Sequence, residues 1–163
     1  MPSSLWREDA EMKNIAYWFI GLATLFALAG MAFGIWMSQS QDYTLAPAHA
    51  HNNLIGWVTL ALYGLYYKAV PAAGKGMLAM VHFWVALLGA IAFGPGIATA
   101  IQQQGELLVI TGSLLTIGAM AIFAWTVFTH RDALSADKMW LRGRLRFSTR
   151  PRGARPASLI RQL

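Results

Sequence analysis

The chain is built on four long apolar stretches separated by short polar segments. The stretches run over about residues 15–37, 48–67, 77–101 and 107–128. Each is close to the ~20 residues that cross the hydrocarbon core of a bilayer as a helix. The apolar runs are continuous rather than alternating, and only helices or closed barrels satisfy their own backbone hydrogen bonds in lipid. The pattern therefore predicts an all-α integral membrane protein with four transmembrane helices.

Short connections and small residues indicate how these helices pack. Because the connections are short, we expect consecutive helices to be antiparallel neighbours in an up-down four-helix bundle. Gly30 and Gly34 lie four residues apart in the first stretch, and Gly89, Gly94 and Gly96 form a small-residue face in the third. Such faces let membrane helices approach closely. Whether they meet within one chain or between two copies stays open at this point.

Length and composition support the bilayer as the solvent. The 163 residues are 56% hydrophobic and only 12% charged, against roughly 25% charged in soluble domains. This excludes an ordinary soluble enzyme. The chain has no cysteine, which excludes disulfides, thiolate metal sites and iron–sulfur clusters. We expect an N-terminal segment over 1–14, a four-helix domain over 15–130 and a basic tail over 131–163. The first stretch is too long for the core of a signal peptide, so we interpret it as an uncleaved span.

The net charge of +6 reflects where the basic residues lie. All 13 fall before the first stretch, between the second and third, or after the fourth: Arg7, Lys13, Lys68, Lys75 and nine from Arg131 onward. The other two connections contain only Asp42 and Glu106 as charged residues. Because positively charged segments stay on the cytoplasmic side, this segregation predicts a cytoplasmic N-terminus and C-terminus.

The tail over 131–163 carries nine basic and two acidic residues, a net charge of +7. Its interleaved glycines and prolines discourage a long helix. We expect an Arg-rich arm that binds anionic lipid headgroups, at roughly 1 kcal/mol per basic residue near the surface. Docking of a partner is an alternative. No folded nucleic-acid module accompanies the arm, so we expect no nucleic-acid partner.

Ionisable groups inside a membrane span are costly and are therefore functional candidates. The stretches contain His49, His51 and His82, with His130 at the edge of the fourth, and they contain no carboxylate or lysine well inside. This argues against a proton-coupled transporter with a carboxylate relay and against a carboxylate-bridged metal centre. The remaining chemistry is that of imidazole.

His49 and His51 fall within the first two turns of the second helix, which Pro47 is suited to open. At about 100° per residue they point about 200° apart around the helix axis, so one ion is not easily chelated by both. Each can instead reach a different ligand on opposite flanks of the helix. A haem on either side suits this geometry because neutral imidazole Nε2 is a standard ligand of haem iron. The alternative is a pair of interfacial polar residues bound to water or to backbone carbonyls.

His82 and His130 lie toward the other end of the spans. His51 and His82 differ in depth by roughly 15–20 Å at 1.5 Å per residue, so they are not the two axial ligands of one haem. A second metal or haem site built from His82 and His130 is one hypothesis, and a structural role for each is the other.

The run from His49 to Trp57, which includes Asn52 and Gly56, resembles the main subunit (subunit I) of haem-copper oxidases and nitric oxide reductases. In that family two histidines separated by one residue ligate the active-site haem and the neighbouring low-spin haem. The family subunit has twelve helices in three four-helix arcs, and this chain is similar to a single arc. The resemblance implies haem b bound near Asn52, Gly56 and Trp57, with His49 and His51 as iron ligands.

Two features of the family are missing from the sequence. The histidine cluster of the copper site with its tyrosine is absent, and the outer connections contain no arginine to neutralise haem propionates. We therefore assign no catalytic residue, and whether the chain is an enzyme stays open. If it is one, the resemblance implies an oxidoreductase of the haem-copper oxidase type.

The resemblance also implies a homo-oligomer. Since one chain offers a single outer pair whose members face opposite ways, His49 of one chain and His51 of the next would hold each haem between them. Three arcs favour a trimer, because heterologous contacts close into rings. The expected function is electron transfer with a redox partner, or O₂ or NO binding, in a bacterial inner membrane. The alternatives are a respiratory assembly or copper-handling protein and a structural membrane protein without a cofactor.

Overall fold

The computed structural model describes residues 4–133, with side chains from Ile15 onward. These residues are helical and include no strand. The elements are α1 (Ser4–Ser40), α2 (Ala46–His51), the π-helix η1 (Asn52–Thr59), α3 (Leu60–Ala69), the 3₁₀ turn η2 (Pro71–Gly74), α4 (Met77–Ile101), α5 (Leu107–Thr129) and the 3₁₀ turn η3 (Arg131–Ala133). The first helix thus begins well before residue 15, inside the segment that we expected to precede the spans. The Arg-rich arm beyond residue 133 and its predicted lipid contacts lie outside the described residues.

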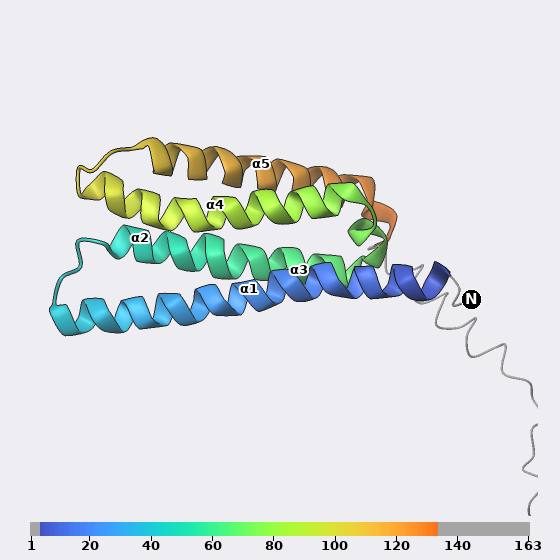
Figure 1. Ribbon diagram of the computed structural model, residues 1–163, viewed down its shortest axis with the longest axis horizontal. Coiled ribbons are helices and arrows are strands. Elements are labelled where there is room, and N and C mark those ends of the chain that lie inside the picture. Colours follow the sequence, from blue (N-terminus) through green and yellow to red (C-terminus); the bar gives the residue numbers. More distant parts are fainter. Residues whose placement is uncertain (1–3, 134–163) are drawn as a thin grey trace, which may run out of the picture. The chain divides into compact units, whose positions relative to one another are not determined.

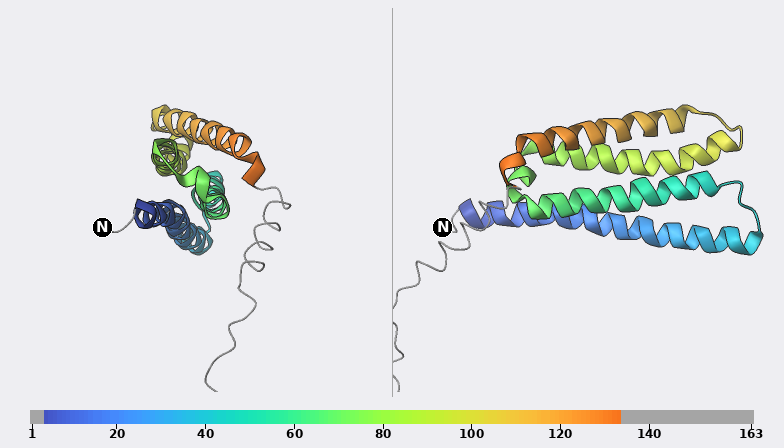
Figure 2. Two further views of the ribbon diagram at one scale, coloured as in Figure 1. Left: turned by 90° about the vertical axis from the view of Figure 1, so that its right-hand side faces the viewer. Right: turned by 180° about the vertical axis from the view of Figure 1, so that it is seen from behind.

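The predicted up-down order of the helices is confirmed. α2, η1 and α3 follow one another without a break, so residues 46–69 form one continuous helical rod, here called the central rod. α1, the central rod, α4 and α5 run alternately up and down (Figures 1 and 2). Short connections join these helices. Gln41 after α1 and Gln103 after α4 adopt the left-handed conformation, with φ of 56° and 58°.

Three helices are long and apolar enough to cross a membrane: Ile15–Ser40, Met77–Ile101 and Leu107–Thr129. Their outward faces are apolar as well, because large side chains such as Leu25 and Leu28 are 60% exposed. An exposed apolar belt of this kind suits lipid rather than water as the surrounding solvent.

The predicted helix over 48–67 is present, but it is not a regular α-helix throughout, because the central rod widens into π geometry across η1. Two neighbouring amides provide a physical reason. Asn52 donates to the backbone carbonyl of Phe26 on α1 (3.4 Å), and Asn53 donates to the backbone carbonyl of His49 (3.1 Å). Asparagine side chains that bond to backbone groups compete with the regular helical pattern. Thr59 adds a hydroxyl bond to the carbonyl of Leu54, five residues earlier (2.8 Å).

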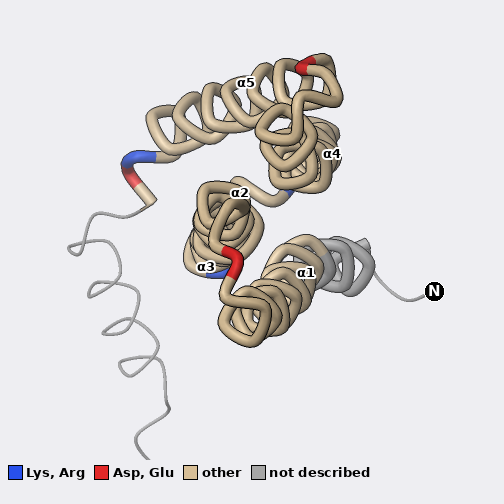
Figure 3. The backbone as a smooth tube through the Cα atoms, turned by 90° about the vertical axis from the view of Figure 1, so that its left-hand side faces the viewer, with Lys and Arg blue, Asp and Glu red and all other residues tan. Residues whose placement is uncertain are grey.

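The four rods form an open arc rather than a closed bundle (Figure 3). α1 packs mainly on the central rod, the central rod packs on α4, and α4 packs on α5. α1 and α5 occupy opposite edges of the arc. The expected four-helix bundle is therefore correct in helix number and order, and the structure corrects its cross-section.

Glycines bring α4 and α5 together. An ideal Cβ at Gly89 would lie 3.1 Å from the backbone nitrogen of Thr116, and one at Gly96 would overlap the backbone of Val109. Since only a residue without a side chain fits at such distances, the small-residue face of α4 packs within the chain, which answers the question left open by the sequence.

Charged side chains between Ile15 and His130 separate into two ends. Lys68 and Lys75 lie at the end where α3 passes to α4, here called the basic end. Asp42 and Glu106 lie in the two connections at the opposite end, here called the acidic end, which faces the viewer in Figure 3. The helical surfaces between these ends carry no charged residue.

Candidate functional site

The candidate haem ligands lie in the first turns of the central rod, at the acidic end. Leu45 precedes the helix, and Pro47 occupies one of its first two positions. A proline is tolerated there because its missing N–H has no partner in the first turn. This local signal starts the helix just before His49 and His51 and brings both imidazoles close to the connection over 41–45.

His51 points from the central rod toward α4. Its ring centroid lies 5.4 Å from that of Phe93 in an edge-to-face arrangement. The Nδ1 atom lies 2.8 Å from the backbone carbonyl oxygen of Pro47, so it carries the proton and donates. This bond fixes the tautomer and leaves Nε2 as the atom with a free lone pair. In the described residues Nε2 has no hydrogen-bond partner.

His49 points toward α1 and is held there. Its ring centroid lies 5.8 Å from that of Phe33, and an ideal Cβ at Gly34 would lie 3.2 Å from its Cε1 atom. The Nε2 atom lies 3.2 Å from the amide nitrogen of Asn53. The Nδ1 atom is buried and has no hydrogen-bond partner among the described residues. His49 is therefore wedged between two helices of its own chain.

The two imidazoles thus contact different helices, on opposite sides of the central rod. His51 meets α4 and His49 meets α1. One ion is not shared between them. Among the described residues, no group of three or more His, Cys, Asp or Glu side chains is placed to hold a metal ion.

The polar residues after His51 attach the central rod to its neighbours. The side chain of Asn52 lies where α4 carries Gly94, and that of Asn53 lies where α1 carries Gly30. At Gly30 an added Cβ would overlap the Asn53 amide. These contacts place the sequence-predicted Asn52 between α1 and α4 as a packing residue.

Gly56 and Trp57 have different surroundings. Gly56 is buried, and a Cβ there would run into the ring of Phe26 on α1. Trp57 is 46% exposed and lies on the outside of the central rod. The structure therefore brings Gly56 to the contact with α1 and leaves Trp57 at the surface.

His82 and His130 have separate partners. His82 is fully buried, and its Nδ1 lies 2.8 Å from the hydroxyl oxygen of Tyr67. His130 donates from Nδ1 to the backbone carbonyl of Thr126 (2.9 Å). No contact between the two histidines appears in the described part of the chain, so the hypothesis of a joint site gains no support. Tyr67 carries no spacing signal in the sequence, because it lies fifteen residues from His82 and on another helix.

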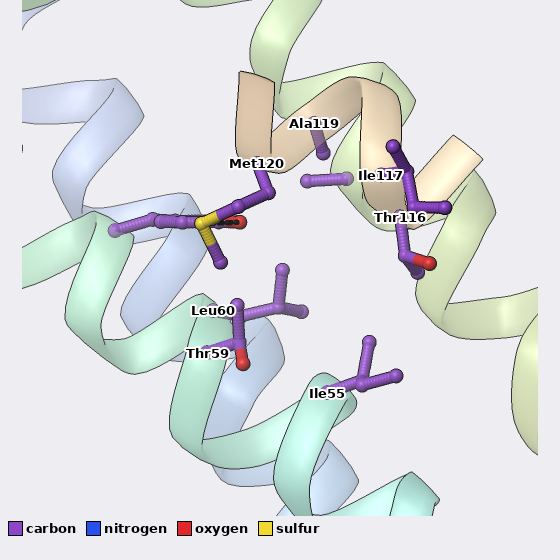
Figure 4. Close-up of a pocket in the computed structure, with 9 residues that line it drawn as sticks. Ile55, Thr59, Leu60, Thr116, Ile117, Ala119 and Met120 are labelled. Carbon is purple, nitrogen blue, oxygen red and sulfur yellow. Dashed lines mark hydrogen bonds between the residues drawn. The ribbon is translucent and has the colours of Figure 1, made fainter. Parts of the chain in front are cut away.

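An apolar groove opens between the central rod and α5 (Figure 4). Its volume is about 200 Å³. Ile55 and Thr59 line one wall, and Thr116 and Met120 line the other. Ile55 lies four residues after His51, about one helical turn further along the central rod.

Of the two predicted iron ligands, His51 is the one whose Nε2 has no hydrogen-bond partner among the described residues. Its Nδ1 bonds to a carbonyl, as in histidines that ligate metals. His49 differs, because the Asn53 amide lies against its Nε2. The donor atom of His51 is therefore the better fit to an iron ligand. Comparisons with models of protein families, with curated proteins and with solved structures found no match for this chain.

Proposed function

We propose that this chain is a membrane b-type haem protein in which His51 binds the iron through Nε2. The observation that carries the proposal is the 2.8 Å bond from His51 Nδ1 to the Pro47 carbonyl. Such a bond orients the ring and raises the basicity of the other nitrogen. Bound haem would supply one-electron chemistry or a site for a diatomic gas. Two histidine ligands would favour electron transfer, since they would leave no iron position open for a gas.

A homo-oligomer is part of the proposal. The apolar groove of about 200 Å³ has no lining contribution from His51, and it is below the roughly 300–1,000 Å³ of pockets that enclose drug-sized ligands. We propose that a porphyrin at His51 would lie between copies, with another copy supplying walls of the site. The second iron ligand would be His49 of a neighbouring copy, whose imidazole would first have to leave the Asn53 amide. We further propose that three copies of the chain form a ring in a bacterial inner membrane, with the basic end of each copy toward the cytoplasm.

A visible spectrum tests the proposal directly. The full chain is purified in detergent with haem supplied, and spectra are recorded oxidised, reduced, and reduced with CO. The proposal expects a Soret band that His51→Ala removes. His130→Ala is the matched control. His130 lies at the basic end, and its Nδ1 makes the same kind of bond, to the backbone carbonyl of the residue four positions earlier in the chain. A protein without a Soret band, or with copper in place of iron by metal analysis, contradicts the proposal. An unchanged spectrum in His51→Ala contradicts the ligand assignment.

A further inference from the structure

Tyr67 and His82 form a buried hydrogen-bonded pair near the basic end. The Tyr67 hydroxyl oxygen lies 2.8 Å from Nδ1 of His82. The two residues are 1% and 0% exposed. Tyr67 lies sixteen residues after His51, roughly 24 Å along the central rod at about 1.5 Å per residue. The pair is therefore a second polar centre, which the proposed haem function does not use.

Aromatic rings from three helices enclose the imidazole of His82. The ring centroids of Tyr63, Phe19 and Phe123 lie 4.5, 5.4 and 5.9 Å from that of His82. They belong to α3, α1 and α5, while His82 belongs to α4. The rings thus separate the pair from the outer surface of the helices on several sides.

The direction of the hydrogen bond between Tyr67 and His82 depends on the tautomer of His82. Its Nε2 atom is buried and has no hydrogen-bond partner among the described residues. A neutral imidazole has a proton on one ring nitrogen and a lone pair on the other. In the tautomer with the proton on Nε2, Nδ1 accepts from the Tyr67 hydroxyl, and this is the tautomer that proton transfer from Tyr67 requires.

We propose that Tyr67 is a redox-active tyrosine and that His82 is its proton acceptor. A one-electron oxidant of the oxidised metal-complex class takes one electron from Tyr67. The O–H bond of Tyr67 breaks, and its proton forms an N–H bond with Nδ1 of His82. The products are a neutral tyrosyl radical, an imidazolium and the oxidant reduced by one electron. When one electron returns to the tyrosyl radical, the proton returns from Nδ1 of His82 to the hydroxyl oxygen of Tyr67.

Burial away from water disfavours the imidazolium product. The ring centroids of Tyr63, Phe19 and Phe123 lie within about 6 Å of that of His82, the range over which a ring face attracts a cation. Two neighbouring tyrosines lack a comparable base. The hydroxyl of Tyr66 bonds to the Thr126 carbonyl (3.3 Å), and that of Tyr63 contacts the sulfur of Met120 (3.8 Å). Of these three neighbouring tyrosines, Tyr67 is therefore the one with a built-in proton acceptor.

Electron paramagnetic resonance after photo-oxidation tests the proposal. The full chain in detergent, without added haem, is flashed with a ruthenium polypyridyl complex and an electron acceptor and then frozen. We expect a tyrosyl signal that Tyr67→Phe abolishes and that the matched controls Tyr66→Phe and Tyr63→Phe retain. His82→Gln, which keeps a hydrogen-bond acceptor but lacks a basic nitrogen, should also lose the signal. A signal unchanged in Tyr67→Phe or in His82→Gln overturns the proposal.

A fluorine-labelled tyrosine at position 67 tests the same proposal without larger substitutions in the core, which can prevent folding. With 3,5-difluorotyrosine at position 67, the radical should show fluorine hyperfine splitting, and a radical without that splitting overturns the proposal. The same flash experiment on His51→Ala should give the full tyrosyl signal. Loss of haem binding and loss of the radical are thus separate results, so either proposal can fail alone.

Discussion

The imidazole of His51 is tied to the turn that precedes it, since its Nδ1 donates to the carbonyl oxygen of Pro47 over 2.8 Å. A carbonyl in this position would orient any imidazole that enters the same space. We predict that His51→Gly loses the low-spin haem spectrum and that added imidazole restores it. Titration of the Soret band with imidazole measures the effect. Equal recovery with pyridine, which has no N–H for the Pro47 carbonyl, would contradict the proposed role of this bond.

Gly30 is predicted to be sensitive to substitution because the Asn53 side chain fills the space where its Cβ would lie. Gly30→Leu should destabilise the fold by about 1–3 kcal/mol, the usual cost of overpacking. Gly21→Leu on the same helix is the control, since nothing lies within 4 Å of a Cβ there. Unfolding in mixed micelles with increasing dodecyl sulfate measures both. Equal stability of the two variants would argue against the packing of α1 on the central rod.

Asp42 at the acidic end should titrate below the usual range of a carboxyl group. Hydrogen bonds from the Thr44 hydroxyl and backbone N–H lower the pKa of Asp42. Because the folded-state pKa lies below the unfolded one, any stabilisation is present above the unfolded pKa and is lost as the pH falls through the folded pKa. We predict that Thr44→Val raises the pKa and that Thr44→Ser keeps it low. The ¹³C shift of the carboxyl group reports each titration, and a low pKa in both variants would exclude the hydroxyl as the main cause.

The groove between the central rod and α5 should matter for assembly if another copy of the chain docks there. We predict that Thr59→Trp, which adds bulk inside the groove, converts a trimer into smaller species. Leu62→Trp adds bulk on an exposed face of α3 outside the groove and should leave the assembly unchanged. Light scattering of the detergent-solubilised protein measures the mass. A trimer in both variants would place the subunit contact elsewhere.

Much of the fold could be predicted from hydrophobic pattern, but the shape of its cross-section and the π-helix could not. Apolar stretches and short connections determine helix number and order, because each helix satisfies its own backbone in lipid. They do not determine which helices meet, and the open arc depends on fits such as that of Gly96 against Val109. The widened turn depends on Asn52 reaching the Phe26 carbonyl, a contact between residues distant in sequence.

The candidate site was predictable to a similar extent. Spacing around a helix correctly separated His49 from His51, since two residues correspond to about 200°. Spacing could not show that the Asn53 amide contacts Nε2 of His49, because that contact depends on the Asn53 side chain turning back along its own helix. The pairing of Tyr67 with His82 also joins two helices and has no periodic signature.

The position of the charged residues has a consequence for biosynthesis. α1 with the central rod forms one hairpin, and α4 with α5 forms another, each closed by a connection at the acidic end (Figure 1). If the hairpins enter the bilayer from the side of their basic ends, the first translocates Asp42 and the second translocates Glu106, and neither translocates a lysine or arginine. Each insertion event then transfers a single carboxylate across the membrane, which protonation can make neutral during passage.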